Sequence, residues 1–224
     1  MTFSLVARRA ETRMLGMAIS FFSPAVAARC ACARAAVGAV ASQNITYPTL
    51  GPKTLDHMAQ GLSAPEAVSA AVADAAHVQY RQLLAVDAMG RTSIHSGSNV
   101  FGNWNEAQGV DVASGGNLLD NDGVSKAIVA GFETAQGHLG DRLIVAMRAG
   151  LAAGCEAGPV YLAGLLLVDK VSWLVAEMRC EWAQVCPIET IATAWDIYKP
   201  QLDDYVRRAL GPSQAPSYDV PGDR

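Results

Sequence analysis

The first eight residues alternate apolar and polar side chains. Phe3 and Leu5 are apolar and Thr2 and Ser4 are polar, and this period of two predicts a strand with one apolar face. A polar turn over residues 9–13 and a second strand over residues 14–20 complete a β-hairpin. Thr2 and Ser4 therefore share the face of the first strand that is not apolar.

Further hairpins and helix pairs follow along the chain. Residues 36–41 are apolar throughout, as expected of a strand covered on both faces, and the Ser63-x-x-Glu66 spacing predicts a capping box at the start of a helix. Asp87 to Gly90 has the composition of a hairpin turn. The other expected elements are helices over 52–60, 63–75, 123–136 and 138–153, strands over 78–87, 91–95, 110–113, 160–169 and 172–178, a loop over 96–105, a turn over 114–117, and a helix from Pro187 that Pro200 interrupts.

The order of these elements predicts the fold class. Antiparallel hairpins with apolar strands, interleaved with helix pairs, suit two packed sheets covered by helices. We therefore expect an α+β protein with a four-layer αββα sandwich. Its 224 residues fit one domain, with an extended tail at about 211–224.

Composition excludes several classes of protein. The net charge is −4 and the basic residues are scattered, which argues against a nucleic-acid partner. No stretch is long and apolar enough to suggest a membrane span. The odd number of cysteines, five, argues against a disulfide framework and favours a cytoplasmic protein. The spacing Cys30-x-Cys32 lacks a second pair or a histidine at ligand spacing, so we expect no metal, and no other cofactor is indicated.

The residue after Met1 suggests chemistry at the terminus itself. Removal of Met1 before Thr2 would place a hydroxyl and a free α-amine on one residue, and the amine can activate the hydroxyl as a general base. Residues 1–28 also admit a second interpretation as a secretory signal, because basic residues precede an apolar run and a small-residue site at Ala25-Val26-Ala27. Gly16 and Pro24 interrupt that run.

Several segments, in order, resemble one family. They are MTFSLVAR at the start, ARAAVGAVASQ at 33–43, TLGPKTLDHMAQGLSAPEAV at 49–68, RQLLAVDAMGRTSIHSG at 81–97, SGGNLL at 114–119 and LGPSQAPSYDVPGD at 210–223. Together they resemble a bacterial family of uncharacterised proteins similar to N-terminal-nucleophile hydrolases. The resemblance implies the αββα fold and hydrolysis of an amide bond, but no particular substrate. We expect the substrate to be a small amide.

The implied mechanism assigns roles to particular residues. Thr2 is the expected nucleophile, and the backbone N–H groups of Gly115 and Gly116, with the Asn117 side chain, are the expected donors to the oxyanion. An ordinary glycine turn before a helix is the alternative for this segment. The expected substrate-lining side chains are Arg8, Ser20, Ser42, Gln43, Asn44 and His95. A solvent-exposed Arg8 and a structural His95 are the alternatives for those two residues.

Large apolar residues depart from the family pattern at two places. Phe21-Phe22 and Tyr161-Leu162 stand where smaller or polar residues are expected. They suit a pocket, an apolar substrate or a protein–protein surface. The second functional hypothesis is therefore a non-catalytic protein of this fold that forms a homo-oligomer through these four residues and serves as a binding or assembly module.

Overall fold

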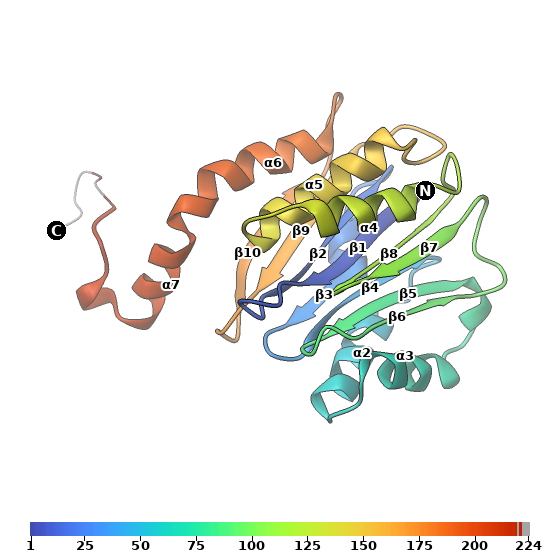
Figure 1. Ribbon diagram of the computed structural model, residues 1–224, viewed down its shortest axis with the longest axis horizontal. Coiled ribbons are helices and arrows are strands. Elements are labelled where there is room, and N and C mark those ends of the chain that lie inside the picture. Colours follow the sequence, from blue (N-terminus) through green and yellow to red (C-terminus); the bar gives the residue numbers. More distant parts are fainter. Residues whose placement is uncertain (219, 221–224) are drawn as a thin grey trace.

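The computed structural model describes residues 1–218 and 220 and contains two antiparallel sheets (Figure 1). One sheet has six strands in the order β10-β9-β2-β1-β8-β7, and the other has four in the order β3-β4-β5-β6. The strands are β1 Thr2–Arg8, β2 Leu15–Phe21, β3 Ala31–Arg34, β4 Gly38–Asn44, β5 Arg81–Asp87, β6 Thr92–Ser96, β7 Asn105–Gly109, β8 Val112–Asn117, β9 Leu162–Val168 and β10 Leu174–Cys180. The α+β class expected from the sequence is confirmed.

Helices cover the outer faces of the two sheets. In Figure 1, α4, α5 and α6 lie over the six-stranded sheet, and α2 and α3 lie under the four-stranded sheet. The helices are α1 Val26–Cys30, α2 Leu50–Ala59, α3 Ala64–Ala73, α4 Val124–Thr134, α5 Leu139–Ala152, α6 Pro187–Tyr198 and α7 Leu202–Leu210, and three short 3₁₀ turns are η1 Val78–Tyr80, η2 Lys199–Gln201 and η3 Pro212–Gln214. The layers therefore run helix, sheet, sheet, helix.

Three apolar clusters separate these layers. Phe3 and Leu5 pack with Phe132 and Trp195 beneath α4, α5 and α6. Val6, by contrast, packs in the cluster between the two sheets, and a third cluster lies between the four-stranded sheet and α2 and α3. Strand β1 thus sends its odd residues toward the helices and its even residues toward the second sheet, as its alternating sequence predicts.

Most of the expected elements are present, with small shifts at their ends. The capping box is confirmed, because the Ser63 side chain accepts from the Glu66 N–H and the Glu66 carboxylate accepts from the Ser63 N–H. Pro200 interrupts the last helical region, as expected, in η2 between α6 and α7. Strand β7 was missed because its sequence, Asn-Glu-Ala-Gln-Gly, is polar, which suits an edge strand with little burial. Part of the expected tail, at residues 219 and 221–224, lies outside the described residues.

The turn expected at residues 114–117 is wrong. These residues continue strand β8, which lies between β1 and β7, so that Gly115 pairs with Ser4 on one side and Glu106 on the other. Adjacent glycines usually indicate a turn, but here a glycine is required at residue 116 by close packing within the sheet. A side chain there would place its Cβ 2.8 Å from the carbonyl oxygen of Thr2.

The N-terminal segment is part of the core. Strands β1 and β2 occupy the middle of the six-stranded sheet, with full ladders on both sides. Residues 2–21 therefore belong to the folded domain, and their apolar composition reflects burial. Among the helices in the described part of the chain, none has the length and hydropathy needed to cross a membrane.

Candidate functional site

Thr2 is the first residue of β1, one of the two middle strands of the six-stranded sheet. It opens β1, pairs with Phe21 on β2 and Asn117 on β8, and is 1% exposed. Because it shares the parity of Val6, its side chain is on the face of the sheet that is turned toward the four-stranded sheet. The residue that the sequence singles out is thus fixed by two ladders rather than carried on a loose terminus.

A chain of buried polar side chains crosses between the sheets next to Thr2. The Ser4 hydroxyl donates to Gln43 Oε1 at 2.6 Å, and Gln43 Nε2 donates to Gln82 Oε1 at 2.7 Å and to the Gly115 carbonyl at 3.1 Å. Gln82 Nε2 donates to Ser96 Oγ at 3.0 Å, and that hydroxyl donates to the Glu106 carboxylate at 2.7 Å. This series of hydrogen bonds links Ser4, two residues after Thr2 on β1, to the edge strands β6 and β7.

We expect Gln43→Leu to lower the free energy of unfolding by about 1–3 kcal/mol. The change removes the partner of the buried Ser4 hydroxyl and of the Gln82 amide oxygen, and such orphaned groups cost this much. Urea denaturation measures the effect, and Gln184→Leu, at an exposed position, is the matched control. Equal stability of the two variants would show that these hydrogen-bonded side chains do not contribute to the free energy of unfolding.

Asn117 lies directly across the ladder from Thr2. It is 2% exposed, and its Nδ2 has no hydrogen-bond partner among the residues that the structure describes. The register puts the Asn117 and Thr2 side chains on the same face of the sheet. A buried amide donor without a partner is unusual in a folded protein, and its position suits a donor to a substrate oxygen bound at Thr2.

Gly115 and Gly116 are placed differently from the expectation. In an antiparallel ladder each backbone N–H of an inner strand points to one of the two neighbouring strands. Both glycines are flanked by β1 and β7, so their N–H groups lie within the ladders. Of the three expected oxyanion donors, the Asn117 side chain is the one whose N–H group has no hydrogen-bond partner among the described residues.

Glu156 is a buried acid that the sequence did not reveal. It is 3% exposed, and neither carboxylate oxygen has a hydrogen-bond partner in the described part of the protein. Burial raises the pKa of this carboxyl to about 8, and the charge of the N-terminal amine acts in the opposite direction. The loop that carries it has no periodicity, and the one available signal was a single charge within the small-residue stretch Ala153-Gly154-Cys155-Glu156-Ala157-Gly158.

The N-terminal amine lies in the same region. Burial lowers the pKa of the Met1 amine, and the Glu156 carboxylate partly offsets this by favouring the ammonium form. Gly158 provides space for the Met1 side chain, since a Cβ at residue 158 would lie 2.8 Å from Met1 Sδ and Cε. Thr2, Asn117 and Glu156 therefore gather around the start of the chain.

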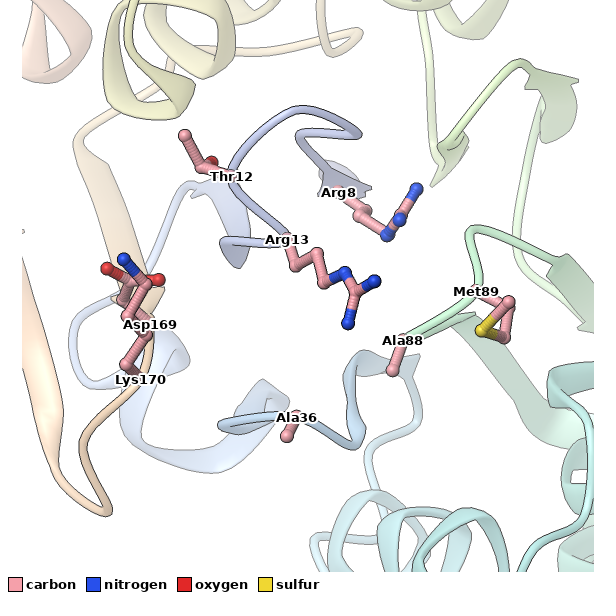
Figure 2. A pocket seen from close by; sticks show the side chains of 8 residues that line it. All are labelled: Arg8, Thr12, Arg13, Ala36, Ala88, Met89, Asp169 and Lys170. Carbon is pink, nitrogen blue, oxygen red and sulfur yellow. The ribbon is translucent and has the colours of Figure 1, made fainter.

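Arg8 lies at the other end of β1. It is six positions along the strand from Thr2, a distance of about 20 Å, so it cannot act on the Thr2 amine by contact. Its guanidinium forms an ion pair with Asp111 at 2.7 Å. It also lines a pocket of about 460 Å³ (Figure 2), and in this view Arg13 reaches into the pocket from the β1–β2 turn. The remaining lining residues are Thr12, Ala36, Ala88, Met89, Asp169 and Lys170.

Four other expected lining residues lie on outer faces of the sheets. Ser20 pairs with Phe3 and so is on the helix-facing side, where its hydroxyl donates to the Leu162 carbonyl at 3.0 Å. His95 pairs with Leu83, which packs toward α2 and α3. Gln43, on β4 of the other sheet, is the one of the six expected lining residues whose side chain reaches across to the β1 end that carries Thr2, through its hydrogen bonds to Ser4 and Gly115.

Ser42 and Asn44 share the outward parity of Val40 on β4 and have structural contacts. The Ser42 hydroxyl donates to the Tyr47 carbonyl at 3.3 Å. Asn44 Nδ2 donates to the Tyr80 carbonyl at 2.7 Å, and its Oδ1 accepts from the Phe101 N–H at 3.2 Å. Asn44 therefore holds the loop after β6 against η1.

The four bulky residues of the sequence pattern do not form one surface. Leu162 is fully buried between the sheets, so its expected place in an interface is wrong. Phe21 is half-buried against the same cluster, whereas Phe22 is 40% exposed. Tyr161 stacks on Trp182 with ring centroids 4.2 Å apart. The exposed aromatic surface is thus Phe22 and Trp182, with the partly buried Tyr161 stacked on Trp182.

Comparison with known proteins identifies related chains. The model of a family of unknown function matches residues 2–191. The crystal structure of a Silicibacter pomeroyi protein with the same family label is 23% identical, with a TM-score of 0.85, and the match covers 92% of this chain and 90% of that one. Anbu (ancestral beta-subunit) from Yersinia bercovieri is 9% identical with a TM-score of 0.39, over 97% and 100% of the two chains. No curated protein matches.

Proposed function

The chain belongs to DUF1028, a family of unknown function, and from the geometry of its own site we propose that it is an amidohydrolase with Thr2 as an N-terminal nucleophile. The observation that carries the proposal is the placement of Thr2. A hydroxyl residue next to the start of the chain is buried in the middle of a sheet, beside two buried polar side chains, Asn117 and Glu156, that have atoms without partners among the described residues.

The layered arrangement supports the same proposal. Two antiparallel sheets packed between helix layers, with β1 in the middle of one sheet, are also the architecture of the N-terminal-nucleophile hydrolases that the sequence resembles. Fold alone does not determine function. The argument therefore depends on the residues around Thr2.

The first half of the reaction forms an ester. Thr2 Oγ attacks the carbonyl carbon of the amide, and its proton passes to the free α-amine of the same residue. Asn117 Nδ2 donates a hydrogen bond to the oxyanion of the tetrahedral intermediate. When the C–N bond breaks, the leaving amine takes the proton from the α-ammonium, and the acyl group remains on Thr2 Oγ.

The second half consumes water. The α-amine removes a proton from a water molecule as the water attacks the ester carbonyl, and Asn117 again supports the oxyanion. The ester C–O bond breaks, the proton returns to Thr2 Oγ, and a carboxylic acid leaves. The sum is amide plus water to acid plus amine, with no cofactor. Thr2→Ala tests the proposal, because it removes the attacking oxygen and leaves the amine.

The substrate that we propose is a small amide with an apolar acyl group. Phe21 pairs with Thr2 and has its parity, so its ring lies on the same face of the sheet. The Phe21 and Phe22 rings are 4.6 Å apart. We propose that these two rings, at the end of β2 that pairs with Thr2, contact the apolar acyl group of the substrate.

A second candidate function is an oligomeric binding or assembly module, and the exposed aromatic surface favours it. Phe22 and Trp182 are 40% and 51% exposed, and Tyr161 connects them, since its N–H donates to the Phe21 carbonyl and its own carbonyl accepts from the Ala183 N–H. Exposed aromatic clusters of this kind are typical of protein interfaces.

We expect Phe22→Ser combined with Trp182→Ser to reduce the particle mass measured by light scattering, if this surface joins two copies of the chain. The two changes remove apolar contact area from the surface and leave the core unaltered. Val185→Ser, at a 93% exposed position outside the aromatic surface, is the control. A mass that stays the same in the double variant would sink the interface hypothesis.

A further inference from the structure

The pocket of Figure 2 lies at the end of β1 opposite to Thr2 and takes no part in the proposed hydrolysis. Hairpin turns of both sheets line it. The β1–β2 and β9–β10 turns of the six-stranded sheet contribute Thr12, Arg13, Asp169 and Lys170, and the β3–β4 and β5–β6 turns of the four-stranded sheet contribute Ala36, Ala88 and Met89. Its volume of about 460 Å³ is within the range of small-molecule sites, about 300–1,000 Å³.

The pocket contains one positive charge without a counter-charge. The Arg8 guanidinium is paired with Asp111 Oδ1 at 2.7 Å, and Asp169 offsets the charge of its neighbour Lys170. The Arg13 side chain forms no ion pair or hydrogen bond with the residues that the structure describes. This excess of positive charge occurs in a protein whose net charge is −4, so the pocket suits an anion.

Arg13 is presented to the pocket by its turn. Its backbone has the left-handed conformation, with φ 63°, and its N–H donates to the Arg9 carbonyl at 2.8 Å. In Figure 2 its guanidinium points into the space between the lining residues. A guanidinium presents a planar fork of N–H donors that matches the two oxygens of a carboxylate.

We propose that this pocket binds a small organic carboxylate, with its charged group on Arg13 and an apolar body against Ala36, Ala88 and Met89. The methyl and thioether groups of these three residues gain from contact with an apolar body, which an inorganic anion lacks. Asp169 repels a second negative charge, so a carboxylate fits better than a phosphate dianion. The proposal does not depend on the chemistry at Thr2.

Cinnamate is the probe, and calorimetric titration of the full-length chain measures its Kd. We expect saturable binding by the original protein and a Kd at least about tenfold higher in Arg13→Gln, because the charge-assisted hydrogen bonds to the carboxylate are lost. Arg13 is exposed in a turn, so the variant should fold normally. Cinnamyl alcohol, which lacks the charge, and inorganic phosphate, which lacks the apolar body, should each bind the original protein at least about tenfold more weakly than cinnamate.

Two controls locate the binding. Arg9→Gln removes the same charge from the same turn, but Arg9 pairs with Glu11 and does not line the pocket, so its Kd should stay within about twofold of the original. Thr2→Ala, at the other end of β1, should also leave the Kd in place. Absence of saturable cinnamate binding, or equal Kd values in Arg13→Gln and the original protein, would overturn the proposal. Binding lost in Thr2→Ala and kept in Arg13→Gln would also overturn it, and would leave the proposed hydrolase standing.

Discussion

Thr2→Ala is expected to lower the hydrolysis of simple acyl amides by at least about 1,000-fold, the scale of losses seen when a nucleophile is removed. The variant keeps the α-amine, Asn117 and the β1 ladders, and lacks the attacking hydroxyl and the γ-methyl group beside it. Turnover is measured with a panel of acyl anilides that release a coloured amine. Intact mass is used to determine for each sample whether the chain begins at residue 2.

Thr2→Ser is the matched control. It retains the hydroxyl, so we expect activity within about tenfold of the original protein, and accumulation of an acyl-enzyme detectable by mass. Thr2→Ala is also expected to fold normally, because loss of a small side chain at the end of a strand costs little compared with the core. Equal turnover in Thr2→Ala and the original protein would refute the nucleophile.

Glu156→Gln is expected to make the protein more stable at pH 8, by an amount on the order of 3–5 kcal/mol. The reason is the raised pKa of Glu156, about 8 in the folded protein against 4.5 for an ordinary glutamate. Between these two values the folded protein binds a proton that the unfolded chain releases. The free energy of unfolding therefore falls as the pH rises through this window, by at most about 1.4 kcal/mol per pH unit.

The measurement is urea denaturation at several pH values from 4 to 9. Near pH 4 both states bind the proton, so the original protein and Glu156→Gln should have similar stability. The two curves should then diverge up to pH 8, because the glutamine stays neutral throughout. Glu11→Gln, exposed in the β1–β2 turn, serves as the control and should follow the original protein. Parallel curves for Glu156→Gln would show that this carboxyl titrates normally.

Local patterns in the sequence predicted most of the elements. The alternation over residues 2–8, the capping box at Ser63 and Glu66, and the turn after Asp87 depend on contacts within a few residues, and each is present. The errors came where tertiary packing overrides local preference. Gly115 and Gly116 are in a strand because they pair with β1 on one side and β7 on the other, and residue 116 is a glycine because the β1 backbone and Leu119 leave no space for a side chain there. Strand β7 is polar because it is an edge strand.

Part of the candidate site can be predicted from the sequence. Thr2, Asn117 and Gln43 are candidates because a terminal hydroxyl, an amide beside glycines and a polar strand exit are visible in the sequence, and the structure places all three in the region where β1 begins. Arg8 and Ser20 were expected nearby. Arg8 is on the same face of β1 as Thr2, as its even position predicts, but it lies at the other end of the strand. Ser20 on β2 pairs with Phe3 and therefore faces the helices, on the side of the sheet opposite to Thr2.

By itself, the sequence determined the α+β class, the faces of β1 and the identity of a terminal hydroxyl, because these follow from periodicity and from the chemistry of single residues. Only the tertiary structure decided what surrounds that hydroxyl. Asn117 reaches Thr2 through strand pairing, and Glu156 reaches the terminus through a bridge to Leu119. Both contacts join residues that are far apart in the sequence, and burial, which leaves Glu156 without a partner among the described residues, is a property of the assembled layers.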